Sequence, residues 1–340
     1  MLLRKNTVKT GNTWPPLEGR RVSWYQRRWE RMLESLVRGV ALVSGISVLL
    51  VVLFLLWEAS SMIGVPSIVS SEQQRAVPLE IDNTRHKSEN NPRRSEVLWS
   101  PAGAPPLHTL WPLLLEGLKV TVIAISVATP LALATALSVA HLGFRRHRRW
   151  AKPVLEMLAS VPSVIVGAFA LIVIAPWVEK MTGLPFRLNA TVAGLALGLA
   201  IVPILFSLAE DAMSAVSVDL IRAALGLGAT PWQVACKVVL PVTAPSLLAS
   251  VLISSTRALG ETMLVLMLCG NISMIRWNPL TPVRTLTSTL AGEMGESTLS
   301  GPHYPMLFVI GLILFVVTSA LTGLAHWLVR RTQRHLREGS

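Results

Sequence analysis

Long apolar stretches alternate with polar connections along this chain, and six of them are long enough to cross a bilayer as helices. They cover about residues 40–57, 120–140, 157–178, 188–209, 238–256 and 305–328, and the fifth continues to residue 270. This pattern predicts an all-α fold, a polytopic membrane protein with six transmembrane helices. No apolar stretch with a small-residue cleavage site opens the chain, so we expect the first helix to be retained.

The same alternation divides the chain into five regions. We expect an N-terminal arm at 1–36, a first transmembrane helix at 37–58, a polar loop at 59–110, a five-helix core at 111–330 and a tail at 331–340. A polar loop at 210–241 interrupts the core. The region 59–110 mixes charges with many turn formers and has no sustained apolar period, which predicts an irregular connection.

Composition strengthens the membrane assignment, and charge adds an orientation. The chain is 51% hydrophobic and 15% charged, with a net charge of +12. The cations gather in the arm, in the tail and between the second and third stretches. The positive-inside rule then places both termini in the cytoplasm and 59–110 outside the cell membrane. Because no recognition motif accompanies the charge, we expect no nucleic acid partner; the basic, tryptophan-containing arm suits membrane lipid.

The segment that follows the fourth stretch has the signals of a compact helix–turn–helix. Asp219 is a candidate cap for a first short helix, and Gly228 permits a tight turn. Thr230 is a candidate N-cap for a second helix, Pro231 suits its first position, and Gln233 completes a capping box.

This elbow presents Leu220, Ala224, Leu227 and Trp232, a set that fits a partner's groove. Since the elbow continues directly into the fifth apolar stretch, motion of such a partner would pull on a membrane helix. The alternative is a simple reversal between two spans.

Two charges interrupt the fifth stretch. Arg257 and Glu261 are four residues apart, so on one helix they share a face, and each is costly in a bilayer unless paired or hydrated. We therefore expect both to face the interior of the bundle. The pair either fixes helix packing or forms a cationic station in an anion pathway, with Glu261 tuning the arginine.

Prolines and glycines mark three other helices. Pro130 lies in the second stretch, and Pro162 and Ser163 lie in the third. Kinks at these positions are compatible with helices around a pathway and with an ordinary bundle. Gly194 and Gly198 form a small-xxx-small pattern, which predicts close helix packing.

The elbow resembles the cytoplasmic EAA loop of ABC-importer permeases, whose pattern is E-A-A, three residues, G, nine residues and I-x-L-P. The matching residues, which the resemblance assigns to ATPase coupling, are Arg222, Ala223, Ala224, Leu227, Gly228, Ala229, Thr230, Trp232, Leu240 and Pro241. Arg222 stands where the family has its Glu, so a salt bridge from that Glu to the ATPase cannot be carried over.

A second resemblance narrows the family. The sequence RALGETM at 257–263, followed by GN at 270–271, is similar to the signature of phosphate-specific permease subunits of the PstC type. The resemblance covers about residues 119–330 and implies a type I ABC-importer-like bundle in the inner membrane. It places Arg257, Glu261 and Thr262 on the substrate pathway.

The resemblance also implies partners: a second, PstA-like permease subunit, a dimer of ATP-binding subunits and an extracytoplasmic phosphate-binding protein. The chain has no phosphate-binding G-x-x-x-x-G-K-[ST] loop, so we expect ATP hydrolysis on the partner, no enzyme activity here and no cofactor. The seven histidines lack metal-ligand spacing, so no metal site is predicted. Transport of another small oxyanion and a scaffold role in phosphate sensing stay open as alternatives.

Overall fold

The structure, a computed structural model, describes residues 32, 35, 43, 46–47, 49–60, 99–100, 107–108, 110–142, 145–183, 186–273, 277–297 and 303–338. The chain divides into two units, Met1–Phe54 and Leu55–Ser340, and each is described by itself. Nearly all of the arm at 1–36 and most of the loop at 59–110 lie outside the described residues, as do the last two residues of the tail.

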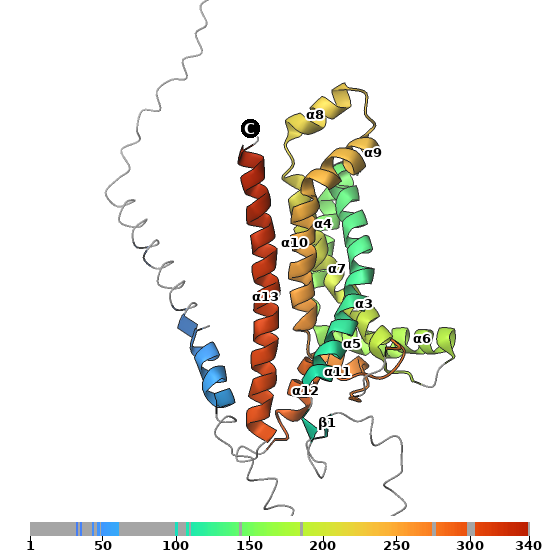
Figure 1. Ribbon diagram of the computed structural model, residues 1–340. Helices are drawn as coiled ribbons and strands as arrows, with labels where there is room; N and C mark the ends of the chain where they lie inside the picture. The colour runs from blue at the N-terminus through green and yellow to red at the C-terminus, as the bar shows by residue number, and fades with distance from the viewer. Residues whose placement is uncertain are drawn as a thin grey trace, which may run out of the picture. The chain divides into compact units, whose positions relative to one another are not determined.

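Helices make up almost all of the described chain (Figure 1). They are α3 (Leu110–Leu137), η2 (Ser138–Leu142), α4 (Arg145–Ala159), α5 (Ser163–Phe169), η3 (Ala170–Ile174), α6 (Ala175–Thr182), α7 (Ala190–Ser214), α8 (Val218–Gly226), α9 (Pro231–Val234), η4 (Ala235–Val239), α10 (Leu240–Leu259), α11 (Met263–Leu268), α12 (Leu286–Glu293) and α13 (His303–Glu338); η marks short π-helical segments. Two-residue strands β1 (Trp99–Ser100) and β2 (Leu107–His108) pair antiparallel before α3.

The predicted fold class is confirmed. Within the described residues, five helical stretches are long and apolar enough to cross a membrane: Leu110–His141, Ser163–Thr182, Ala190–Ser214, Pro231–Leu259 and His303–Arg331. A shorter apolar helix, Leu49–Ser60, occupies part of the first predicted span, whose remaining residues are largely outside the described set.

Close packing of α3 against α7 forms the centre of the second unit. Four alanines repeat every four residues along α3 and expose no surface: Ala124, Ala128, Ala132 and Ala136. On α7, a Cβ atom added to Gly198 would lie 2.9 Å from the carbonyl oxygen of Ala124, and one added to Gly194 would lie 2.6 Å from Ile123. The predicted small-residue packing is therefore confirmed, and it brings two backbones together.

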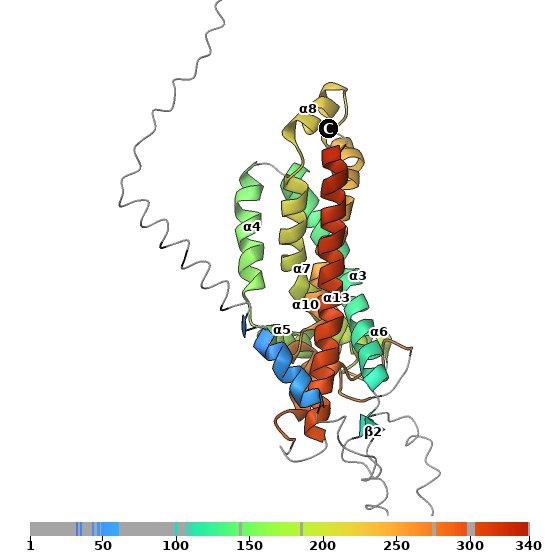
Figure 2. The same cartoon turned by 60° about the vertical axis from the view of Figure 1, so that its left-hand side comes forward.

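The third predicted span, 157–178, is found at Ser163–Thr182, but its predicted start is wrong, because residues 157–159 belong to a separate helix. Helix α4 ends at Ala159, and Pro162 precedes α5 with extended backbone angles, φ −55° and ψ 133°. A proline has no N–H to continue the helix and disfavours helical geometry at the residue before it, so the chain turns here. After the turn, α5, η3 and α6 run across the long axes of α3 and α13, whereas α4 lies beside α7 (Figures 1 and 2).

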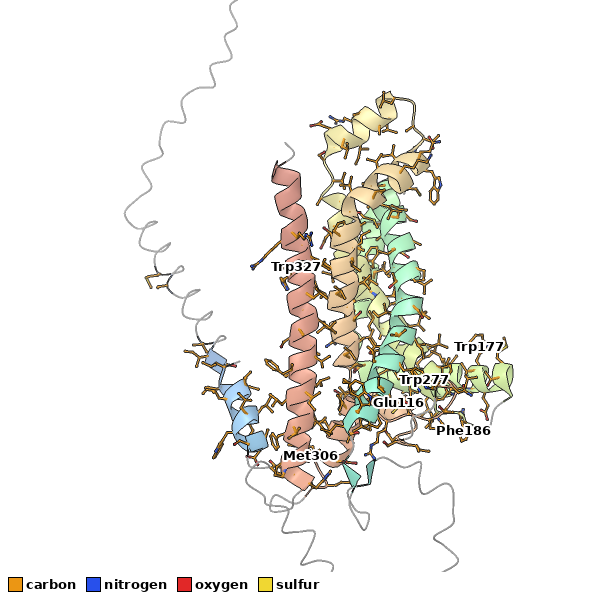
Figure 3. All side chains as sticks on the ribbon, viewed as in Figure 1. Glu116, Trp177, Phe186, Trp277, Met306 and Trp327 are labelled. Carbon is orange, nitrogen blue, oxygen red and sulfur yellow. The ribbon has the colours of Figure 1, made fainter. Side chains whose placement is uncertain are left out.

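The bundle has two distinct ends. The elbow, α8 and α9, lies at one end together with the C-terminal part of α13, and α12 and β1 lie at the other (Figure 1). Among the exposed tryptophans, Trp177 and Trp277 lie toward the α12 end, and Trp327 lies nearer the α8 end (Figure 3).

The α3–α7 contact makes a testable prediction. Gly198→Ala places a methyl group against a backbone carbonyl that cannot rotate away, so we expect it to destabilise the chain by about 1–3 kcal/mol. Gly323→Ala is the matched control, because a Cβ there meets nothing within 4 Å. Thermal unfolding of each purified variant in detergent gives its melting temperature. Equal melting temperatures for Gly198→Ala and Gly323→Ala would contradict the tight contact.

Candidate functional site

A cleft opens between α10 and α13. Its volume is about 420 Å³, and it is lined by Ile253, Thr256, Arg257, Gly260, Thr318 and Thr322. Among these six lining residues Arg257 alone is charged. The cleft therefore has one cationic group against an otherwise neutral, threonine-rich wall.

Arg257 is more exposed than its sequence predicts. Its side chain is 64% exposed in the isolated chain, whereas that of Glu261 is 12% exposed. The expectation that both would face the interior is therefore wrong for Arg257. Their closest charged atoms, Arg257 Nη2 and Glu261 Oε2, are 4.0 Å apart. Because water screens the exposed Arg257, the pair is loose at this separation and contributes little to stability.

The two charges also do not share one helix. Helix α10 ends at Leu259, and Gly260 and Glu261 complete its last turn by donating backbone N–H bonds of 3.2 Å to Thr256 and Ala258. Thr262 follows as the residue before α11, and its hydroxyl donates to the Gly260 carbonyl at 3.3 Å. The charged pair thus spans a helix end, and the predicted continuous fifth span is broken here.

The threonine hydroxyls of the cleft are already used as donors. Thr256 donates to the Leu252 carbonyl at 3.1 Å, Thr318 to Leu314 at 2.8 Å and Thr322 to Thr318 at 2.9 Å, each within its own helix. The Arg257 guanidinium is therefore the main donor toward the cleft. A planar guanidinium with several N–H groups suits a small oxyanion.

The elbow has the predicted local structure. Gly228 adopts φ +86°, a conformation that favours glycine. Thr230 accepts from the Gln233 backbone N–H at 3.3 Å, the Gln233 side chain accepts from the Thr230 N–H at 2.9 Å, and Pro231 opens α9. The capping box is confirmed. Asp219 lies in the first turn of α8, and Ser217 occupies its N-cap position, so the predicted Asp219 cap is wrong.

The elbow presents apolar side chains to its surroundings. Leu227 is 90% exposed and Trp232 is 61% exposed, and no residue of α8 is buried. Arg222 and Ala223 are also exposed, whereas Ala224 and Ala229 are half-buried. Such a surface is suited to a partner protein.

Helix α10 joins the elbow to the cleft. Leu240 and Pro241 are its first two residues, and Arg257 lies near its end, about 25 Å away at 1.5 Å per residue. Pro130, inside α3, and Pro162 and Ser163, at the start of α5, are all described and are not among the residues that line the cleft.

Sequence reasoning missed part of this site. Thr318 and Thr322 face Arg257 from α13 and were not singled out, although polar residues four apart in an otherwise apolar span are a usable signal. Away from the cleft, sequence reasoning also missed an ionic cluster, which Lys152 of α4 forms with Glu210 and Asp211 of α7. These partners are separated by almost sixty residues, so no local pattern links them.

Residues 128–334 match the family of binding-protein-dependent transport system inner membrane components. The chain belongs to this family. The phosphate transport system permease protein PstC of Mesorhizobium japonicum is 30% identical over 228 residues, which cover 62% of this chain and 69% of that protein. The probable ABC transporter permease protein YqgH of Bacillus subtilis is 28% identical over 233 residues, covering 68% and 75%.

These relatives confirm the resemblance to PstC-type permeases that the RALGETM segment indicated. A solved inward-facing structure of the MetNI methionine ABC transporter also aligns with this permease. The alignment covers 64% of this chain and 93% of the MetNI chain, with 18% sequence identity and a TM-score of 0.49. The permease is a multi-pass membrane protein.

The turn at Gly228 makes a second testable prediction. Gly228→Ala puts a side chain on a left-handed backbone, so we expect about 1–2 kcal/mol of local strain and faster amide exchange across 219–234. Gly226→Ala is the matched control. A Cβ atom would meet nothing within 4 Å at either position, and of these two glycines only Gly228 has a positive φ. Hydrogen exchange with mass spectrometry checks this; equal protection in both variants would mean that the turn relaxes without strain.

Proposed function

We propose that this chain is the transmembrane permease subunit of an ATP-driven phosphate importer, in which it forms half of the translocation pathway and couples to a cytoplasmic ATPase. The observation that supports this most is Arg257, which is exposed to the α10–α13 cleft and only loosely paired. The PstC relatives support phosphate as the substrate.

In this proposal, Arg257 is a transient station for the anion. Its guanidinium attracts phosphate and donates to its oxygens, while Glu261 at 4.0 Å weakens the attraction enough for release. Thr262 sits in the break between α10 and α11, beside the pair. Binding at an exposed site is weak because water screens the charge, and a transport pathway needs weak binding to release its substrate.

The open cleft supports a paired subunit. An arginine that is 64% exposed in a membrane helix needs a polar or aqueous surrounding, and a second, PstA-like permease subunit facing the cleft would enclose one. The second subunit would thereby complete the pathway, with membrane lipid covering the remaining apolar faces.

The exposed elbow supports a cytoplasmic partner. Leu227 and Trp232 would seat in grooves of an ATP-binding subunit dimer, where ATP is hydrolysed, and both termini of the permease would lie on that side. An extracytoplasmic phosphate-binding protein would deliver the anion at the opposite end, where α12 lies.

Two other functions predict different results. A permease for another small oxyanion predicts uptake of sulfate or molybdate in preference to phosphate. A scaffold for phosphate sensing predicts that Arg257 variants alter regulation and leave uptake intact.

The third testable prediction concerns Arg257. In cells that lack their own high-affinity phosphate uptake and carry this chain with its partner subunits, we expect Arg257→Ala to reduce labelled-phosphate uptake at least about tenfold, a change of ~1.4 kcal/mol. Arg257→Lys should retain part of the activity, because it keeps the charge and loses the planar fork.

Arg187→Ala is the control for loss of a loosely paired arginine. Arg187 Nε lies 3.9 Å from Glu179 Oε2, and its side chain is 52% exposed, so its environment resembles that of Arg257 away from the cleft. Membrane levels of each variant are measured by immunoblot. Full phosphate uptake by Arg257→Ala in an assembled complex would show that this residue is not part of the pathway. Uptake of sulfate or molybdate without phosphate by the wild type would show that the substrate is another oxyanion.

A further inference from the structure

A small ionic cluster ties the last turns of α7 to α4. Lys152 Nζ of α4 donates to Glu210 Oε2 at 2.7 Å and to Asp211 Oδ1 at 2.8 Å, both in α7. The second oxygen of Glu210 accepts from the Ser214 hydroxyl at 2.7 Å. The two helices lie side by side in this region (Figure 2).

A second element holds the same turn. His141, in η2, makes a 3.1 Å hydrogen bond between its Nε2 and the carbonyl oxygen of Met213. Side chains from two different elements therefore reach the final turns of α7. The chain leaves this turn at Ser214 and begins α8 at Val218, so the ties lie immediately before the elbow formed by α8 and α9.

The members of the cluster depend on one another. The Glu210 side chain is 2% exposed, and a buried carboxylate is strongly destabilising unless it is paired and hydrogen-bonded. Asp211 is 64% exposed, so water screens its contribution. Hydrogen bonds to Asp211 and then to Glu210 raise the pKa of Lys152 above its ordinary value. A raised lysine pKa means that the charged form is fully present at neutral pH and is lost only in strong base.

The elbow (α8 and α9) is anchored mainly at its ends, and in α8 the half-buried Ile221 and Ala224 add contacts to the core. Helix α8 has no buried residue. After α9 begins, Val234, Ala235 and Val239 are buried in the core, and the helix continues without a break into α10. The C-terminal end of the elbow is therefore continuous with α10. The position of its N-terminal end is set by how firmly the last turn of α7 is held.

We propose that Lys152 is a positioning residue for energy coupling: by holding Glu210 and Asp211 it fixes the end of α7 to α4, so that displacement of α8 is passed into α10. A firmly held α7 acts as the fixed support of the loop. If its last turn could loosen, the same displacement would unwind that turn and leave α10 and Arg257 where they are. This inference rests on the coupling role proposed above.

The first test measures coupling in the complete complex. The permease is reconstituted in vesicles with its partner subunits, and the phosphate transported per ATP hydrolysed is compared between variants. We expect Lys152→Met to lower this ratio about three- to tenfold while ATP hydrolysis continues. Lys152→Arg should restore it, because a guanidinium can serve two adjacent carboxylates.

Matched variants separate positioning from simple folding. Ser214→Ala removes one hydrogen bond of Glu210 and keeps the ion pair, so its ratio should stay within about twofold of wild type. Glu210→Gln removes the charge and retains an oxygen for Ser214; it replaces Lys152→Met if the latter does not reach the membrane. A wild-type ratio in both Lys152→Met and Glu210→Gln would overturn the proposal.

A second measurement does not depend on the substrate. Hydrogen exchange of the full-length permease should show amides of 209–216 exchanging about tenfold faster in Lys152→Met and at the wild-type rate in Lys152→Arg. Unchanged exchange overturns the tie, and faster exchange with an unchanged transport ratio overturns the coupling role. If the wild-type complex moves no phosphate, the proposed substrate fails, and the exchange experiment still decides whether Lys152 holds the end of α7.

Discussion

The close approach of α3 and α7 determines how the remaining helices pack. In a bilayer, apolar helices gain little by leaving lipid for one another, so association depends on tight packing of small residues. The alanine stripe of α3 and the glycines of α7 supply that packing. Helix α10 packs on both of these helices, α4 packs on α7, and α13 packs on α10. The ionic cluster lies on α7 itself, and the cleft lies on α10, which packs against both helices of the pair.

Features of the fold were predictable from the sequence where a single local property, such as apolar length or residue spacing, determines them. Apolar length located the spans, and the Gly194–Gly198 spacing located the closest contact. The start of the third span was wrong because apolar length does not encode direction: residues 157–178 are largely apolar, but one helix ends at Ala159 and a crossing one begins at Ser163, after Pro162. The single proline was noticed, yet its effect on direction depends on α11 and α7, against which the crossing segment packs.

The candidate site was predictable in its local chemistry and not in its surroundings. Capping of α9 needs only Thr230 and Gln233, which are three residues apart, so the pattern alone specifies it. The exposure of Arg257 depends on where α13 lies relative to α10, which no short pattern records. The tie from Lys152 to Glu210 likewise joins distant positions, and a basic connection between spans is ordinarily interpreted only as an orientation signal.

The break at Gly260 connects these observations. If Arg257 and Glu261 were in one continuous helix, their separation would be set by helical geometry and would change little when α10 moves. Because α10 ends at Leu259, the position of Glu261 is set by the Gly260–Thr262 segment and by α11, which packs on α5 and α12. Glu261 is still tied to the end of α10 by one backbone hydrogen bond, to the Ala258 carbonyl, so a change in the Arg257–Glu261 separation here strains that bond and leaves the hydrogen bonds inside α10 and α11 in place. Under the coupling role proposed above, the charge available to an anion in the cleft would depend on how far that last turn of α10 gives when the elbow moves.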